Sequence, residues 1–539
     1  MALTKSQCFE LALANISRYG DTDVFPYPIE NLIFYDEPND ARAVLTEIDA
    51  SFEKSLQQFP PVSVKSLSAV GYSGFRWATQ IDPIWNAYLL AQVILIGDDI
   101  EKARVPTDRN VVFSYRYQPN QDTSQIFDVK IGWIKYQEHS VELARKYAFV
   151  LECDISDFYP RIYHHRVENA LKKATKNSES TRRIMEMLGR LSDGIVSYGL
   201  PIGGPASRIL SELLLNRIDR LLLSENINFC RFVDDFHIFA NSREEAYRHL
   251  VFLSEILLVN EGLSLQKTKT RILTSKDFLA QSSFAVENQP DSPEAAEAQR
   301  FSRIRLYFDP YSPTAEDDYE ALKDELSKFD IVAMLARELA KSRIDEGLTR
   351  RLVSAVKHLS TTSKNQAVSS LIRNLDVLYP VFPTVMLLLR AVMDDIEDGT
   401  KIEVFRTLRN LINGGSYITQ VPANLSFALR VLSHDKSDET DALLAKLFKQ
   451  PLNMMLKRDI ILLMANRGAD YWISNCGKQY KVLTPWERRA LIISSYLLED
   501  EGNHFRKGIK DEVSPMDRLA LKWAGNKKGT SGGSWNIPV

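Results

Sequence analysis

Cys230-Arg231-Phe232-Val233-Asp234-Asp235-Phe236-His237-Ile238-Phe239 places two adjacent aspartates between two apolar runs. Two short apolar runs that flank a polar break predict a β-hairpin with the carboxylates at its turn. Buried carboxylates without a counter-charge are costly, so a pair in this position indicates a cation site. The alternative is an ordinary turn, because adjacent aspartates are common in turns.

A second segment supplies another carboxylate. In Phe149-Val-Leu-Glu-Cys-Asp154-Ile-Ser-Asp-Phe-Tyr159-Pro160, an apolar strand ends at Asp154 and an amphipathic helix is expected to follow. Nucleotidyl transfer uses two Mg²⁺ ions about 3.5–4 Å apart, and Mg²⁺ prefers carboxylate oxygens and substrate phosphates. We therefore expect Asp154 and Asp234 to be catalytic metal ligands, with Asp235 as a further ligand or charge partner. Mn²⁺ could replace Mg²⁺.

A third segment is a Gly/Pro loop, Gly199-Leu-Pro-Ile-Gly203-Gly204-Pro205, that runs into a helix through Ser207. Apolar residues at 209, 210, 213, 214 and 218 fall on one helix face. Glycines allow a backbone to approach a base pair closely, and a helix start can face phosphate. The alternative is that the loop is only a helix cap.

Two further segments carry cations. Leu265-Gln-Lys-Thr-Lys269-Thr-Arg-Ile272 follows the hairpin, and Val111-Val-Phe-Ser-Tyr-Arg116-Tyr117 is expected to be a strand that presents Arg116. Taken singly, each indicates a solvated face. Together they lie where a polymerase needs positive charge on an incoming triphosphate.

In this order, the five segments resemble reverse transcriptases of the bacterial group that includes group II intron and retron enzymes, over roughly residues 105 to 275. Asp154 matches the first palm aspartate, and Phe232–Asp235 matches the Tyr-x-Asp-Asp box with Phe in place of Tyr. The loop at 199–207 matches the template-and-nucleotide loop, and Gln266 replaces Asn in the Leu-Asn-x-x-Lys-Thr block. The resemblance implies that Tyr159 is a steric gate beneath the sugar, and that the nucleotide is bound by Arg116, Ile155, Tyr159, Gly203 and Lys269.

The chain of 539 residues is too long for one core, so we expect two or three domains. We expect an N-terminal helical or fingers extension at 1–100, an α+β fingers-and-palm domain at 101–280, a linker at 281–315, and an all-α, HEAT-like helical-repeat domain at 316–539. An irregular helical bundle is the alternative for the last part. Because the net charge is -3, nucleic acid would have to bind in a local positive groove.

The helical-repeat prediction rests on amphipathic runs with apolar residues at i, i+3, i+4 and i+7, separated by short polar turns. The runs are Ile331–Lys341, Leu348–Leu359, Asn365–Leu378, Pro383–Val392, Ile402–Ile412, Asn424–Leu432, Asp441–Leu447 and Asn453–Met464.

This tail, with the blocks Gly74–Trp77 and Phe308–Thr314, is similar to the AbiK-like branch of abortive-infection, defence-associated reverse transcriptases. That likeness implies antiphage activity, a toroidal homo-oligomer (trimer or hexamer), and DNA synthesis that can be untemplated and protein-primed. The partners would be dNTPs, a single-stranded DNA product that can be covalently attached, and RNA. Tyr27, Tyr35 and Tyr311 lie in segments suited to priming, but the sequence selects no priming residue.

Other functions remain open. The chain could be a conventional reverse transcriptase that copies an RNA template, or an inactive polymerase-fold scaffold, although three retained aspartates argue against the scaffold. An RNase site at Arg351 and His358 is a further alternative, since both residues fit a loose Arg-x6-His spacing. Because we find no signal peptide and no apolar stretch long enough to span a bilayer, we expect a soluble protein of the bacterial cytoplasm, without membrane contact.

Overall fold

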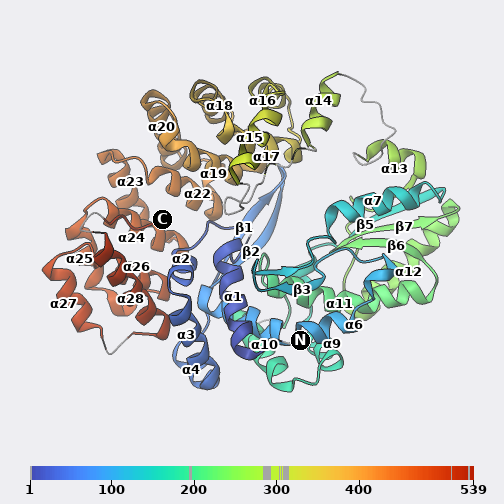
Figure 1. The fold of residues 1–539 in the computed structure, drawn as a ribbon, viewed down its shortest axis with the longest axis horizontal. Coiled ribbons are helices and arrows are strands. Elements are labelled where there is room, and N and C mark those ends of the chain that lie inside the picture. The colour runs from blue at the N-terminus through green and yellow to red at the C-terminus, as the bar shows by residue number, and fades with distance from the viewer. Residues whose placement is uncertain are drawn as a thin grey trace.

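The computed structural model describes residues 3–22, 24–192, 197–282, 293–302, 304, 306, 315–510, 513–531 and 535–539, with the side chains of 315–318 excluded (Figure 1). Tyr311, the segment 308–314 and much of the expected linker lie outside the described residues. Within that linker, the described part forms α14 (Pro293–Ser302).

A four-stranded antiparallel sheet has the strand order β6-β7-β5-β8, with β6 (Asn228–Phe232), β7 (Asp235–Ala240), β5 (Phe149–Asp154) and β8 (Arg271–Thr274). The β6–β7 hairpin and the strand that ends at Asp154 confirm the sequence prediction. The helices around this sheet are α7 (Trp133–Ala144), α8 (Phe158–Arg161), α9 (His164–Ala174), α10 (Ser178–Leu191), α11 (Pro205–Ser224), α12 (Arg243–Glu261) and α13 (Ser275–Gln281).

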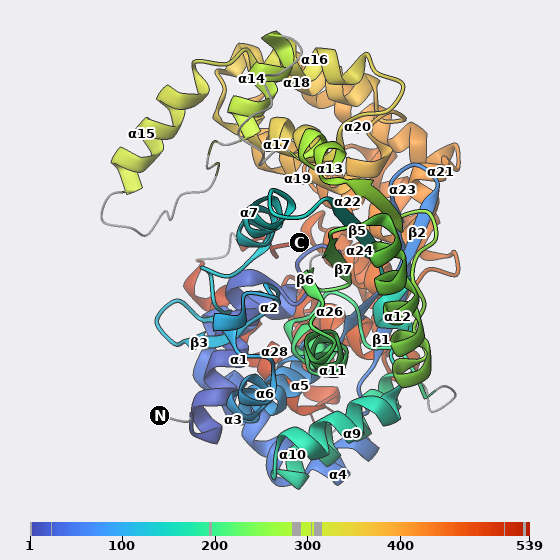
Figure 2. The same cartoon turned by 90° about the vertical axis from the view of Figure 1, so that its right-hand side faces the viewer.

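The sheet is covered on both faces because its strands alternate two sets of apolar side chains. Val150 and Phe239 pack against Tyr136 of α7 and Phe278 of α13. The other face packs against α11 and α12 (Figure 2). After Asp154 the chain first forms the single turn α8, and the amphipathic helix expected there begins later, as α9.

The N-terminal part contains a hairpin that the sequence prediction missed. Residues 1–100 were expected to be helical, but β1 (Ser63–Val70) and β2 (Gly74–Ile81) pair antiparallel there. The predicted range of the strand at 111–117 is also wrong, because β3 begins only at Tyr117. The remaining elements are α1 (Lys5–Tyr19), α2 (Ile29–Asp36), α3 (Pro38–Ala50), α4 (Phe52–Gln58), α5 (Pro83–Leu95), α6 (Gly97–Ala103), β3 (Tyr117–Asn120) and β4 (Gln125–Phe127).

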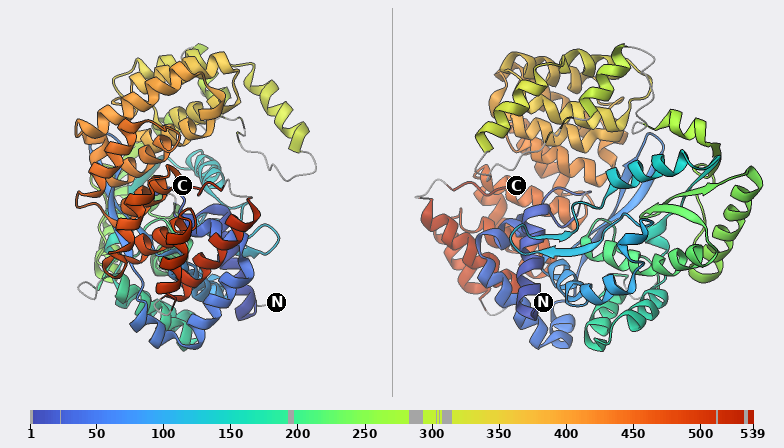
Figure 3. Two further views of the ribbon diagram at one scale, coloured as in Figure 1. Left: turned by 90° about the vertical axis from the view of Figure 1, so that its left-hand side faces the viewer. Right: turned by 45° about the vertical axis from the view of Figure 1, so that its right-hand side comes forward.

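The C-terminal region is helical, and each of the eight predicted runs corresponds to a helix. In one row α17, α19, α22, α24, α26 and α28 pack in succession, while α16, α18, α20 and α23 form a second row. Figures 1 and 3 show these helices curving in an arc. The helices are α15 (Ala315–Leu326), α16 (Ile331–Leu339), α17 (Glu346–Ala355), α18 (Thr361–Arg373), α19 (Phe382–Val392), α20 (Asp398–Asn413), α21 (Tyr417–Gln420), α22 (Pro422–Leu432), α23 (Asp438–Phe448), α24 (Met454–Asn466), α25 (Asp470–Gly477), α26 (Pro485–Ser494), α27 (Asp500–Gly508) and α28 (Pro515–Thr530).

The end of this arc packs on the N-terminal helices (Figure 3). The guanidinium of Arg489 in α26 lies 2.8 Å from Glu30 of α2, and both side chains are buried. Trp486 donates a hydrogen bond to Asp82 at 3.1 Å. Among the described residues, no helix is long and apolar enough to cross a bilayer.

Candidate active site

Asp154 and the aspartate pair come together at one end of the four-stranded sheet. The last residue of β5, Asp154, lies directly opposite Asp235 in the antiparallel register, and Asp234 occupies the β6–β7 turn. The amide of Ile155 donates to the carbonyl of Asp234 at 3.2 Å, and that of Gln266 donates to the carbonyl of Asp154 at 2.7 Å. The sheet therefore fixes all three aspartates on adjoining strands.

The turn that carries Asp234 is held in an unusual conformation. Val233 has φ 57°, in the left-handed region that β-branched residues avoid. Its amide donates to the hydroxyl of Ser114 at 2.9 Å, and its carbonyl accepts from Arg231 at 2.8 Å. These two hydrogen bonds offset the strain and hold the turn in place.

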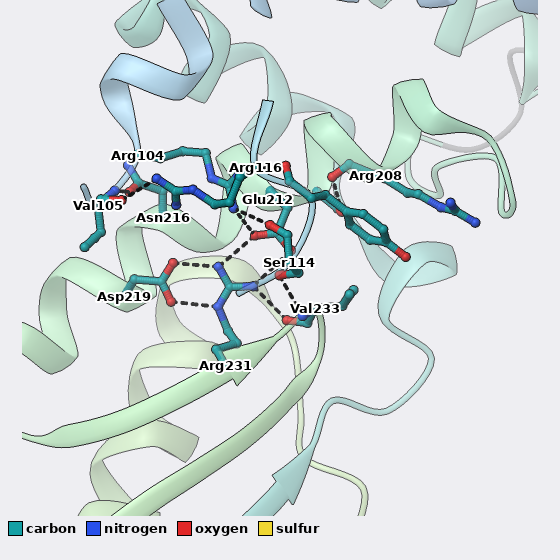
Figure 4. Close-up of polar contacts among 12 residues, drawn as sticks. Arg104, Val105, Ser114, Arg116, Arg208, Glu212, Asn216, Asp219, Arg231 and Val233 are labelled. Atoms are coloured by element: carbon teal, nitrogen blue, oxygen red, sulfur yellow. Dashed lines mark hydrogen bonds and ion pairs between the residues drawn. The ribbon is translucent and has the colours of Figure 1, made fainter. Parts of the chain in front are cut away.

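A buried ion network lies beneath this turn (Figure 4). The guanidinium of Arg231 pairs with Asp219 at 2.6 Å and with Glu212 at 3.0 Å, and all three side chains are at most 2% exposed. Glu212 also accepts from Ser114 at 2.5 Å and from Arg104 at 2.7 Å. Removing one partner from such a network leaves a buried charge uncompensated, which is strongly destabilising. The network therefore connects α11 rigidly to the aspartate turn.

The carboxylates repel one another, and this changes their protonation. Burial, together with the charges of Asp154 and Asp235, raises the pKa of Asp234 to about 7. Burial and Asp154 raise the pKa of Asp235 to about 6. The ammonium of Lys269 lies 2.5 Å from Asp154. Burial lowers the pKa of Lys269, but the hydrogen bond and charge of Asp154 outweigh this and raise it overall. One lysine thus faces three acidic groups, and a local excess of negative charge remains.

That excess fits divalent cations. Within the described part of the chain, no three His, Cys, Asp or Glu side chains are grouped so that they could hold a metal ion by themselves. Mg²⁺, however, is commonly bound by one or two carboxylates with substrate phosphates and water completing its shell. The mutual repulsion of Asp154, Asp234 and Asp235 is the electrostatic condition that a cation relieves. The donor set therefore fits Mg²⁺ that arrives with a nucleotide.

A cavity of about 1480 Å³ opens at these carboxylates. Both Asp154 and Asp234 line it, whereas Asp235 lines a second cavity of about 550 Å³. Lys269 and Asp154 contribute to both cavities. Of the expected nucleotide-binding residues, the structure brings four to the larger cavity: Ile155, Tyr159, Gly203 and Lys269.

The loop beside Tyr159 depends on two glycines. Gly199 has φ 97° and Gly203 has φ 114°, a backbone region that other residues rarely adopt. A Cβ on Gly199 would lie 3.3 Å from the carbonyl of Pro160, and the next amide donates to the carbonyl of Tyr159 at 2.9 Å. The hydroxyl of Tyr159 is hydrogen-bonded to Ser211 of α11. The loop is thereby fixed against the ring expected to form the steric gate.

Arg116 does not reach the cavity in this structure. Its residue is 3% exposed, and its guanidinium pairs with Glu101 at 2.6 Å and donates to the carbonyl of Val105 at 2.8 Å. Figure 4 shows it beside the buried network, on the far side of Glu212 from Arg208. The expectation failed because Glu101, the partner that holds Arg116, could not be identified from the local pattern.

Other cations line the larger cavity: Arg76, Arg161, Arg166 and Arg208. The guanidinium of Arg208 lies 5.0 Å from the centre of the Tyr115 ring. Arg208 could have been selected as a site residue from the sequence, because it follows Ser207 in the first turn of the helix after the glycine loop. Arg76 lies on the β1–β2 hairpin, which went unrecognised. Arg351 and His358 do not line this cavity, and the Arg351 side chain donates to the carbonyl of Ile304.

Comparison with known proteins gives one family match. Residues 99–294 match the family model described as reverse transcriptase (RNA-dependent DNA polymerase). No curated protein matches the chain significantly. Solved structures with a detectable likeness include telomerase from Candida albicans in complex with a TWJ fragment of telomeric RNA, at 11% identity, with 70% of this chain and 69% of that chain covered and a TM-score of 0.30. Apo telomerase from Candida tropicalis gives 11% identity, 72% and 74% coverage and a TM-score of 0.29.

The family match makes this part of the chain a reverse transcriptase domain. The protein is accordingly an enzyme of the DNA polymerase kind, a nucleotidyltransferase. Proteins with this domain generally use divalent metal ions and bind nucleotides and RNA templates. The fold combines this α/β domain with the helical C-terminal region.

Proposed function

We propose that the protein adds dNTPs to a growing DNA strand at the carboxylates of Asp154 and Asp234. One observation carries the proposal: the strand end at Asp154 and the turn at Asp234 meet at the floor of a cavity that also contains Lys269. Bound Mg²⁺ would activate the attacking 3′-hydroxyl and stabilise charge on the phosphoryl oxygens. Asp154 and Asp234 would hold these ions, and Asp235 would add to the negative potential from the neighbouring cavity.

The chain's own groups would position the nucleotide. Lys269 supplies a cation beside Asp154 that suits a triphosphate, and Arg208 supplies a second cation in the same cavity. The ring of Tyr159, fixed by Ser211, would exclude a 2′-hydroxyl. We assign no triphosphate contact to Arg116, because its guanidinium is committed to Glu101.

The assay for this proposal supplies each labelled dNTP and Mg²⁺ to the purified protein, with and without an RNA or DNA template. Incorporation in either setting that is lost in Asp154→Asn supports the proposal. Incorporation that persists in that variant contradicts it. Templated synthesis is the second candidate for the mode of action. The observation that favours it is that no residue of the described helical region lines the larger cavity, so this region does not block it.

The finer assignment is a role in antiphage abortive infection, within the AbiK-like branch, as a homotrimer or homohexamer. Support for it comes from the motif blocks and from the two-row helical region. Phage plaque counts on cells that carry the wild type or Asp234→Asn would test the defence role, and sedimentation would test the assembly. Equal protection by both forms would contradict a defence role that requires synthesis. The domain boundaries at residues 100, 280 and 315 likewise remain predictions.

Protein priming is part of the same proposal. Tyr27 is a poor candidate, since its hydroxyl donates to the carbonyl of Ser17 and burial raises its pKa. Tyr35 is 66% exposed and stays a candidate. Digestion of labelled protein with protease and nuclease, followed by mass spectrometry, would locate a nucleotidylated peptide. DNA that separates completely from denatured protein would exclude priming from a side chain and favour the templated mode.

A further inference from the structure

The β1–β2 hairpin presents an exposed aromatic face that the catalytic chemistry does not use. Trp77 pairs across the strands with Leu67, and Phe75 pairs with Ala69, so the four side chains lie on one face. Phe75 is 53% exposed and Trp77 is 52% exposed. Exposed rings are expensive to leave in water, and two neighbouring rings at alternate positions of a strand indicate a surface that meets a ligand.

The opposite face of the hairpin anchors it. Val64 and Ala78 are buried against Val421, Ala423 and Trp486 of the helical region. At the tip, the hydroxyl of Tyr72 donates to the carbonyl of Val377 at 2.7 Å and accepts from the amide of Ile344 at 3.2 Å. Base and tip are thus both fixed to the helical region, which leaves the aromatic face in one orientation. A preorganised surface binds with less loss of entropy.

This aromatic face borders two cavities. Leu67, Phe75 and Trp77 line the large cavity that contains Asp154 and Asp234. The same three side chains line a further cavity of about 430 Å³, whose other wall comes from the helical region and includes Tyr417, 52% exposed. The hairpin therefore borders both the cavity at the carboxylates and the cavity at the helical region, and Figure 1 shows β1 and β2 between the four-stranded sheet and the C-terminal helices.

The charges along this surface suit a phosphate backbone. Arg76 stands between Phe75 and Trp77 in β2, so its side chain leaves the strand on the face opposite the rings; it also lines the large cavity, and within the described part of the chain its guanidinium has no carboxylate partner. Arg161 and Arg166 line the same cavity, as do the half-exposed rings of Tyr163 and Tyr198. Rings that stack on bases, interleaved with cations that follow phosphates, are the elements of sequence-tolerant single-strand binding.

We propose that the face formed by Leu67, Ala69, Phe75 and Trp77 is a stacking site for single-stranded nucleic acid, which guides the strand between the catalytic cavity and the helical region. The site rests on the proposed function for its place in the reaction, because the strand that it holds is the one on which the carboxylates act. The bases of DNA and of RNA both offer a face for stacking, so the proposed ligand is an unpaired strand of either kind. The test separates DNA from RNA.

The test measures binding without catalysis. Fluorescein-labelled dT20 and rU20 are titrated with the full-length protein by anisotropy, in EDTA and without dNTPs. In the double variant Phe75→Ala/Trp77→Ala, affinity for at least one oligonucleotide is expected to fall about tenfold or more. Trp77→Phe retains a ring and should stay within about threefold of the wild type. Tyr471→Ala, which removes an 81% exposed ring from the helical region, is the matched control and should bind as the wild type does.

A second readout tests the cation. Arg76→Gln should weaken binding of both oligonucleotides alike and reduce the slope of log affinity against log salt by about one ion. Unchanged affinity of the double variant for both oligonucleotides would overturn the proposal, as would a wild type that binds neither. A double variant that changes only the oligomeric state, measured by sedimentation, would also overturn it and assign the face to a second copy.

Failure of the polymerase proposal and failure of the strand-binding proposal give different results. Binding of dT20 or rU20 that depends on the two rings, in a protein that incorporates no dNTP, would retain the strand site and refute the proposed chemistry. If Asp154→Asn abolishes incorporation while removal of the two rings leaves oligonucleotide binding unchanged, the proposed chemistry is retained and the strand site is refuted.

Discussion

Replacing Asp234 by asparagine should stabilise the metal-free protein while abolishing its chemistry. Asp234 lies beside Asp154 and Asp235, and burial with these two charges raises its pKa to about 7. Asparagine has nearly the same shape and carries no charge. The substitution therefore removes the repulsion without removing the turn that Ser114 and Arg231 hold.

The magnitude follows from the pKa. A carboxylate whose pKa stands at about 7 instead of 3.8 destabilises the fold by up to about 4 kcal/mol when it is fully ionised. Because Asp234 keeps partial contact with solvent, about 2 to 4 kcal/mol is the expected range. A raised carboxyl pKa means that the folded state binds more protons than the unfolded state between about pH 4 and pH 7. The penalty is thus absent below pH 4, grows through this window and is complete above pH 7.

The assay is thermal unfolding in EDTA at pH 8 and at pH 4.5, combined with dNTP incorporation in Mg²⁺ at pH 8. Asp234→Asn should melt a few degrees above the wild type at pH 8, with little difference at pH 4.5, and should lose at least about 100-fold in incorporation rate.

The matched control is Asp157→Asn, which changes the same charge in the same cavity. Asp157 has φ 49°, which asparagine tolerates, and its exposed side chain pairs only loosely with Arg161 at 3.5 Å. This variant should match the wild type in both measurements. Equal melting temperatures of Asp234→Asn and wild type at pH 8, or an equal gain at both pH values, would refute the electrostatic account.

Three further predictions concern the same site. Mg²⁺ should raise the melting temperature of the wild type more at pH 8 than at pH 5.5, because its carboxylate ligands must be ionised; an equal gain at both would contradict the assigned ligands. Ser114→Ala should lower kcat about tenfold with little change in KM for dNTP, since the hydroxyl holds the Val233 amide beside Asp234; an unaltered kcat would remove Ser114 as a positioning residue. Tyr159→Ala should reduce the preference for dNTP over NTP, and unchanged selectivity in that variant would count against the steric gate.

The sequence was sufficient for features that depend on local pattern. The β6–β7 hairpin follows from two apolar runs around Asp234, and the buried face of α11 follows from its apolar spacing. Eight of the helices of the tail could be placed for the same reason, because each carries a complete amphipathic period.

Features that depend on distant partners could not be derived. Arg116 is buried because Glu101 neutralises it, and a strand pattern that includes Arg116 equally allows exposure. Glu30 and Arg489 are 459 residues apart, so no local sequence pattern could predict that the helical arc packs on the N-terminal helices. The β1–β2 hairpin was missed because several of its buried positions, such as Ser66, Ala78 and Gln80, are small or polar and interrupt the apolar alternation.

The most direct test of the nucleotidyl-transfer centre is the release of pyrophosphate from dNTP, measured together with incorporation, for wild type, Asp154→Asn and Asp157→Asn in Mg²⁺. The account predicts one pyrophosphate for each nucleotide incorporated by the wild type, the same from Asp157→Asn, and neither product from Asp154→Asn. Pyrophosphate release and incorporation by Asp154→Asn at the wild-type rate would contradict the assignment of these carboxylates as the catalytic centre.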